Sequence, residues 1–138
     1  MKLIIVSGRS GSGKSVALRV LEDLGYYCVD NIPVNLLPAL THTVINDYET
    51  VAVSIDVRNL PDEPSDVADI LDYLPNNVEL SILYLDAEDV DLIRRFSETR
   101  RLHPLIRKNI ALDQAISLEK KLLEPISSRA NLYFNTSQ

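Results

Sequence analysis

Short runs of apolar residues, many of them β-branched or aromatic, alternate in this chain with segments in which apolar residues recur every three or four positions. Five apolar runs predict buried strands, at residues 3–6, 26–29, 51–55, 80–85 and 132–134. The helical spacing predicts helices over residues 16–24, 36–46, 65–74 and 89–100, and from residue 113 to beyond Pro125, which interrupts the last one. Strands that alternate with helices indicate an α/β fold with a mostly parallel five-stranded sheet.

The first apolar run leads into the segment Gly8-Arg9-Ser10-Gly11-Ser12-Gly13-Lys14-Ser15. This segment matches the phosphate-binding pattern G-x-x-x-x-G-K-[ST] at every fixed position, between a predicted strand and a predicted helix. Backbone N–H groups of such a loop and the positive end of the following helix bind phosphate. We expect Lys14 to contact the β- and γ-phosphates and Ser15 to bind Mg²⁺. The sequence therefore predicts a three-layer, kinase-like P-loop NTPase fold.

Three of the predicted strands end in an aspartate, at Asp30, Asp56 and Asp86. Ligands of open parallel sheets collect at the carboxyl ends of the strands. Asp56 is the first candidate to hold Mg²⁺ or its water shell beside Ser15. Asp30 could act as a general base on a substrate hydroxyl or on water, whereas Asp86 resembles the cap of the next helix. Together with Lys14, Asp56 and Asp30 are the catalytic candidates.

A basic segment follows a long acidic stretch. Residues 61–93 contain ten acidic side chains and no Lys or Arg, whereas residues 94–108 contain six basic side chains and one acidic side chain. Four of these basic residues lie on or just after one predicted helix: Arg94, Arg95, Arg100 and Arg101. They could form a lid whose guanidinium groups contact phosphate, with Arg100 and Arg101 as candidate ligands, or a solvated helix face. His103, before Pro104, is interpreted as a turn residue.

The composition describes one globular domain of 138 residues with a formal net charge of −6 and a pI near 4.8. Such an acidic chain lacks the cationic surface that RNA phosphates need. The single cysteine, Cys28, excludes an internal disulfide and favours a reducing cytoplasm. No apolar run approaches the ~18 residues of a membrane span, so we expect a cytoplasmic domain without membrane contact.

Four segments of the chain resemble the N-terminal domain of the RapZ family of bacterial P-loop proteins, called YvcJ in Gram-positive bacteria. They cover residues 8–18, 25–33, 52–59 and 97–105, and the likeness extends over essentially the whole chain. The resemblance implies ATP at the Gly8–Ser15 loop and a GTP contact formed by Asp56, Val57, Arg58 and Asn59. It also implies weak ATP or GTP hydrolysis at most.

Enterobacteria-like members of this family act as RNase adapters, so the resemblance implies a protein that presents a small regulatory RNA to an endoribonuclease and thereby controls amino-sugar synthesis. By this resemblance, residues 1–138 are expected to be the nucleotide-binding N-terminal domain of a longer protein that forms homo-oligomers. The RNA and the endoribonuclease would bind mainly through a C-terminal half that is absent here. Many members read Asp-Thr-Ser near the last strand, where this chain has Asn135-Thr136-Ser137.

Two alternatives to the adapter remain open at this point. The first is a small-molecule kinase in which Asp30 activates the substrate hydroxyl and the segment Arg94–Arg101 is the lid. The second is a P-loop domain without turnover that acts only in assembly. Substitution of Lys14 separates the second alternative from the adapter and the kinase. It should abolish nucleotide binding, on which the adapter and the kinase depend, and leave the role in assembly intact.

Overall fold

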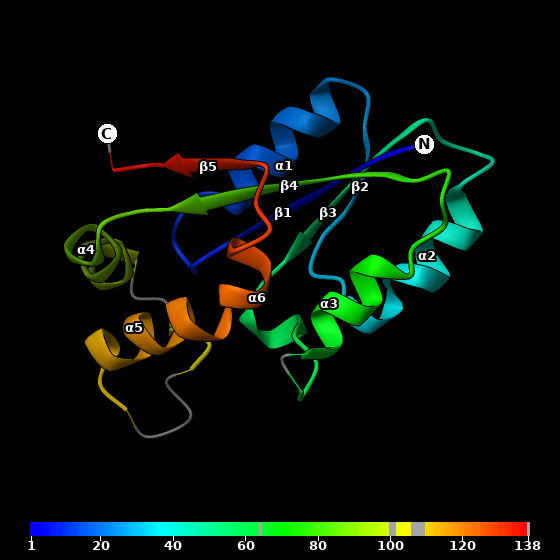
Figure 1. The fold of residues 1–138 in the computed structure, drawn as a ribbon. Helices are drawn as coiled ribbons and strands as arrows, with labels where there is room; N and C mark the ends of the chain where they lie inside the picture. Colours follow the sequence, from blue (N-terminus) through cyan, green and yellow to red (C-terminus); the bar gives the residue numbers. More distant parts are fainter. Residues whose placement is uncertain (64, 100–101, 106–109, 138) are drawn as a thin grey trace.

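A computed structural model describes residues 1–63, 65–99, 102–105 and 110–137. In these residues the strands are β1 (Lys2–Gly8), β2 (Tyr27–Val29), β3 (Thr50–Ile55), β4 (Glu79–Asp86) and β5 (Leu132–Asn135). They form one five-stranded sheet in the order β2-β3-β1-β4-β5, and every neighbouring pair is parallel (Figure 1). The predicted α/β class with a parallel five-stranded sheet is confirmed.

Helices cover both faces of the sheet (Figure 1). The described helices are α1 (Lys14–Asp23), α2 (Leu37–Val44), α3 (Ser65–Asp72), α4 (Asp89–Thr99), α5 (Leu112–Leu122) and α6 (Glu124–Ser127). Two 3₁₀ turns, η1 (Val34–Leu36) and η2 (Val57–Asn59), follow the ends of β2 and β3. The predicted elements are therefore present, with α2 and α3 shorter than expected and Pro125 in the first turn of α6.

Successive side chains of β1 point to alternate faces of the sheet, so the core has two layers. Leu3 and Ile5 are buried against residues of α2, α3 and α6, while Val6 packs on the opposite face with Leu18 of α1. Because successive side chains of a strand point to opposite faces, a central strand that is apolar throughout must be covered on both sides. This arrangement is the predicted three-layer fold.

The parallel register brings the carboxyl ends of the strands to one edge of the sheet. The end of β1 lies between β3 and β4, with Ser7 opposite Ile55 and Gly8 opposite Leu85. The glycine-rich loop after β1 therefore lies between the segments that follow β3 and β4. The same edge is where open α/β sheets bind their ligands.

One apolar surface on the α1 face is exposed. Val16 and Val20 of α1 and Leu132 and Phe134 of β5 are each more than half exposed. Such a surface favours association, so a homo-oligomer remains a prediction. No helix in the described residues is long and apolar enough to cross a bilayer.

Candidate functional site

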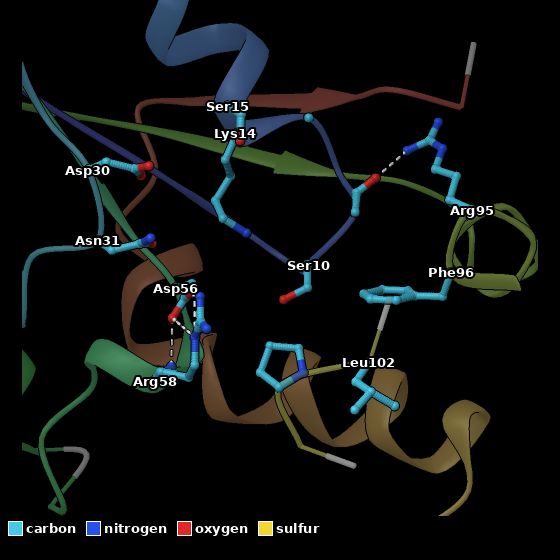
Figure 2. Close-up of a pocket in the computed structure, with 13 residues that line it drawn as sticks. Ser10, Lys14, Ser15, Asp30, Asn31, Asp56, Arg58, Arg95, Phe96 and Leu102 are labelled. Atoms are coloured by element: carbon cyan, nitrogen blue, oxygen red, sulfur yellow. Dashed lines mark hydrogen bonds and ion pairs between the residues drawn. The ribbon is translucent and has the colours of Figure 1, made fainter. Parts of the chain in front are cut away.

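A cavity of about 520 Å³ opens at the carboxyl edge of the sheet (Figure 2). It is lined by Ser10, Gly11, Gly13, Lys14, Ser15, Asp30, Asn31, Asp56, Arg58, Arg95, Phe96, Leu102 and Pro104. These residues come from the loop after β1, the start of α1, the segments that follow β2 and β3, helix α4 and the segment 102–104. The fold thus brings together most of the site residues that the sequence predicts.

Two glycines give the loop its shape. Gly8 has a φ of +147°, and a Cβ there would lie 2.0 Å from the carbonyl oxygen of Leu85, so no other residue fits beside β4. Gly13, with φ +103°, is the N-cap residue of α1, and in the described part of the chain no side chain caps this helix end. The N–H groups of the first turn of α1 can therefore bind an anion.

Lys14 extends from the start of α1 into the cavity (Figure 2). Its Nζ donates hydrogen bonds to the carbonyl oxygens of Gly8 at 2.8 Å and of Arg9 at 3.3 Å. Burial lowers the pKa of Lys14, while the carboxylates of Glu119 and Asp56 act in the opposite direction. A phosphate in the cavity would give this partly buried ammonium group a charged partner next to the loop backbone.

The Arg9 side chain points away from the cavity and is only 1% exposed. Its Nε donates to Asp86 Oδ1 at 2.7 Å, its Nη1 to Asp89 Oδ1 at 2.6 Å and its Nη2 to the Ala87 carbonyl at 2.8 Å. Burial lowers the pKa of Arg9, but these carboxylates more than offset it and the pKa is raised. Only the backbone of Arg9 can therefore belong to a phosphate cradle.

Asp86 takes a structural position. Besides Arg9, its carboxylate accepts hydrogen bonds from the Tyr133 hydroxyl at 2.6 Å and from the Ala87 N–H at 2.9 Å. Its side chain is 5% exposed and belongs to a buried ion pair that joins the loop to β4 and β5. The sequence interpretation of Asp86 as a helix cap missed this pair.

Ser10 is held by a second buried carboxylate, from helix α5. The Ser10 N–H donates to Glu119 Oε1 at 2.9 Å, and its hydroxyl donates to Oε2 at 2.7 Å. The same Oε1 lies 2.9 Å from Nε2 of His103. His103 is 2% exposed, so the residue that the sequence suggested to be a turn residue is part of the buried support of the loop. Ser12, also in the loop, is fully buried.

Asp56 and Asp30 both line the cavity, as expected from the ends of their strands. Asp56 accepts the backbone N–H of Arg58 at 2.8 Å and forms an ion pair with its guanidinium at 2.5 Å. These interactions raise the pKa of Arg58, the hydrogen bond to Asp56 being the largest cause. Asp30 accepts a hydrogen bond from the Ser54 hydroxyl.

The other two residues of the predicted GTP contact support the turn rather than face the cavity. Val57 is buried against Leu105 and Ala115. Asn59 accepts the backbone N–H of Asp56 at 2.9 Å and donates to the Asn31 carbonyl at 3.2 Å. These bonds fix η2 and, through it, the direction of Asp56.

The donors at this edge suit Mg²⁺, which prefers oxygen ligands and keeps several of its waters. The Ser15 hydroxyl and the Asp56 and Asp30 carboxylates line the same cavity. The described residues contain no cluster of three or more His, Cys, Asp or Glu side chains that could enclose a metal ion. A cation held by one or two side chains and by phosphate oxygens fits this arrangement.

Of the predicted basic segment, Arg95 lines the cavity. It donates to the carbonyl oxygen of Gly11 at 2.8 Å (Figure 2). It also donates to the carbonyl oxygen of Thr136 at 3.0 Å, and so bridges the loop and the residue that follows β5. Arg94 instead pairs with Asp91 at 3.0 Å and has a side chain that is 62% exposed, as on a solvated helix face. Arg100 and Arg101 lie outside the described residues.

The predicted site does not include Glu119, although the spacing of this residue along the helix carried a signal. Ala115, Ile116 and Leu123 are the buried positions of α5 and its continuation, and Glu119 falls in the same stripe. A carboxylate within an apolar helix face must be paired with donors when it is buried. Phe96 and Leu102, which form the apolar wall of the cavity, had no sequence signal of their own.

Comparison with known proteins decides the family. The model of the RapZ-like N-terminal domain matches residues 1–138. The chain belongs to the RapZ-like family. A "nucleotide-binding protein" of Colwellia psychrerythraea is 79% identical over all 138 residues, which span 49% of that protein. A "nucleotide-binding protein" of Pseudoalteromonas atlantica is 68% identical over the same residues, again 49% of its length. The RapZ-like chain thus spans about half the length of these curated relatives.

Solved structures confirm the fold of this RapZ-like domain. Shikimate kinase from Bacteroides thetaiotaomicron superposes with a TM-score of 0.60 at 16% identity, over 96% of this chain and 85% of that one. A gluconokinase from Sinorhizobium meliloti gives a TM-score of 0.55 at 15% identity, over 99% and 83%. At such low identity these likenesses show a kinase-like P-loop fold and no more.

Proposed function

We propose that this RapZ-like domain binds ATP or GTP with Mg²⁺ in the cavity at the Gly8–Ser15 loop and hydrolyses the nucleotide weakly. The observation that carries the proposal is the partly buried ammonium group of Lys14, which lines the cavity and lies on the loop beside the uncapped end of α1. Ammonium and helix N–H groups that converge on a cavity form an anion site. The nucleotide-binding names of the relatives support this assignment.

Each residue of the site has a defined task in this proposal. The backbone from Gly8 to Gly13 surrounds the phosphates, and Lys14 bonds to the β- and γ-phosphate oxygens. Ser15 and Asp56 would hold Mg²⁺, which neutralises charge on the phosphates when bound. Asp56 already accepts three donors from Arg58, its backbone N–H, Nε and Nη2, so the guanidinium would have to share this carboxylate with the cation. Asp30, which accepts the Ser54 hydroxyl, would orient the attacking water.

Calorimetric titration of ATP and GTP, with and without Mg²⁺, tests the proposal. Lys14→Ala should weaken binding by at least about tenfold, because hydrogen bonds to charged groups contribute about 1.5–3 kcal/mol. Lys120→Ala, which removes an exposed ammonium group from α5, is the matched control and should bind like the wild type. Equal affinities of all three proteins, or no nucleotide binding by the wild type, would refute the assignment.

We further propose that the domain belongs to an RNase adapter that presents a small regulatory RNA to an endoribonuclease and so controls amino-sugar synthesis. The family membership and the relatives' double length support this role. With a net charge of −6, residues 1–138 should bind RNA poorly, so recognition would reside in the other half. Filter binding at physiological salt that shows tight, specific RNA retention by residues 1–138 would contradict this division of labour.

A small-molecule kinase is the second candidate. Asp30 and Asn31 line one side of the cavity, whereas Phe96 and Leu102 line the other (Figure 2), and an acceptor would lie between these walls beside the phosphates. Two structures of the same fold are described as shikimate kinase and gluconokinase. Transfer of the labelled γ-phosphate to a small hydroxylated metabolite, abolished by Asp30→Asn, would favour this candidate over the adapter.

A further inference from the structure

The hydrogen bonds that hold Ser10 continue through the interior of the domain, from the phosphate loop to the opposite wall of the cavity. Glu119 and His103 both have side chains that are 0% exposed, although each carries polar atoms. Glu119 comes from α5, and His103 comes from the segment 102–105, whose Leu102 and Pro104 line the cavity. Two buried polar residues therefore connect the two sides of the proposed nucleotide site.

The hydrogen bonds define the state of each group. The Leu105 N–H donates to His103 Nδ1 at 3.1 Å, so this nitrogen is an acceptor and the proton of the neutral ring is on Nε2. Nε2–H then donates to Glu119 Oε1 at 2.9 Å. Glu119 thus accepts three donors, from His103, from the Ser10 N–H and from the Ser10 hydroxyl. This set provides the buried carboxylate with three donors, and among the described residues no Lys or Arg forms an ion pair with it.

The ring of His103 also contacts the aromatic wall. The centroids of Phe96 and His103 lie 5.1 Å apart. Phe96 in turn packs close to the loop, since a Cβ built on Gly11 would lie 3.4 Å from its ring. A displacement of His103 would therefore reach the loop by two routes, through Glu119 to Ser10 and through Phe96 to Gly11.

We propose that Glu119 and His103 are positioning residues for the phosphate loop, and that nucleotide affinity depends through them on the 102–105 wall of the cavity. The inference rests on the proposed nucleotide site. Glu119 fixes the Arg9–Ser10 peptide by its N–H group, next to a glycine that would otherwise let the loop rearrange. A loop already held in its binding conformation loses less entropy when the phosphates bind.

Substitutions at position 119 distinguish this role from simple stabilisation. Glu119→Ala removes all three acceptor contacts and should weaken ATP binding about tenfold or more. Glu119→Gln keeps an oxygen for the Ser10 N–H and for His103, and its amide can donate to the Ser10 hydroxyl. This variant should bind ATP within about threefold of the wild type. Glu124→Ala, which removes an exposed carboxylate five residues away, is the control.

His103→Ala should also weaken ATP binding, by about threefold to tenfold, because Glu119 loses one of its three donors. His42→Ala, on the exposed side of α2, is the matched control. Hydrogen exchange of the Ser10 amide adds a readout that a general loss of stability would not reproduce. Without nucleotide, this amide should exchange faster in Glu119→Ala than in Glu119→Gln, while amides of the sheet strands change equally little.

The outcomes separate this inference from the proposed function. If the wild type binds ATP and Lys14→Ala does not, while folded Glu119→Ala and His103→Ala bind like the wild type, only the inference is wrong. Equal losses in Glu119→Gln and Glu119→Ala would also overturn it, because the charge and not the hydrogen bonds would then matter. If Glu119→Ala fails to fold, Glu119→Gln and His103→Ala decide. No binding by the wild type would overturn both proposals.

Discussion

The buried ion pair between Arg9 and Asp86 makes a sharp prediction for stability. Asp86→Ala removes the acceptor of Arg9 Nε and also leaves the Tyr133 hydroxyl without its acceptor. The Arg9 guanidinium remains enclosed, with the half-exposed Asp89 as its other carboxylate. A buried charge that loses its partner is the most costly form of this change.

The magnitude follows from the exposures. The side chains of Arg9 and Asp86 are 2% and 5% exposed, so removal of Asp86 should cost about 3–5 kcal/mol. The side chain of Asp89 is 56% exposed, and Asp89→Ala should therefore cost about 1 kcal/mol or less. Each substitution removes one carboxylate partner of Arg9. The two carboxylates differ in their burial and in the additional donors that Asp86 accepts.

Equilibrium unfolding in urea measures the difference. With a slope of about 2 kcal/mol/M, Asp86→Ala should lower the midpoint by about 1.5–2.5 M and Asp89→Ala by about 0.5 M or less. The double variant Arg9→Met/Asp86→Leu should cost less than the sum of its single substitutions, because no buried charge is left unpaired. Equal midpoints for Asp86→Ala and Asp89→Ala would refute the reasoning.

Three further substitutions test other parts of the structure. Gly8→Ala places a Cβ 2.0 Å from the Leu85 carbonyl oxygen, and thermal melts should show a loss of about 3 kcal/mol or more. Burial, together with the hydrogen bond to Asp86, raises the pKa of Tyr133 to about 12. Between about pH 10 and 12 the unfolded state therefore loses this proton before the folded state does, so the free energy of unfolding falls as pH rises. In Tyr133→Phe this free energy should fall less steeply over the same range. Burial lowers the pKa of Lys14, so Lys14→Met should raise the free energy of unfolding without nucleotide.

Each of these has an outcome that would contradict it. A Gly8→Ala protein that melts at the wild-type temperature would mean that β4 can move away from the loop. Identical unfolding curves of wild type and Tyr133→Phe from pH 9 to 12 would show that ionisation of the Tyr133 phenol does not contribute to the pH dependence of stability. A less stable Lys14→Met protein would show that the ammonium bonds to the Gly8 and Arg9 carbonyls outweigh the desolvation of the charge.

Much of the fold could be predicted because buried parallel strands have a simple pattern. The apolar run over 51–55 predicts β3 to within one residue of its observed start at Thr50. The order of the strands could not be predicted in this way, because β1 pairs with both β3 and β4 through contacts far apart in sequence. Helical crossovers of similar length are compatible with several orders, and local patterns do not choose among them.

The site likewise has features that the sequence predicts and features that it does not. The loop is readable because the left-handed conformation of Gly13 and the close approach of Gly8 to β4 each demand glycine. Arg9 occupies a position that the pattern leaves free, and nothing local indicates that its side chain turns inward to Asp86. A carboxylate at a strand end is equally compatible with a metal ligand, a helix cap or an ion pair, so only the folded arrangement decides.

The distance along the chain between Ser10 and Glu119 has a consequence during synthesis. These residues are 109 positions apart, so at about 5–20 residues per second the ribosome makes Glu119 about 5–20 s after Ser10. A nascent chain that has completed β1 and α1 already carries the whole glycine-rich motif, but not the carboxylate that fixes it. Nucleotide should therefore leave the early nascent chain unchanged and stabilise it only after α5 has left the ribosome.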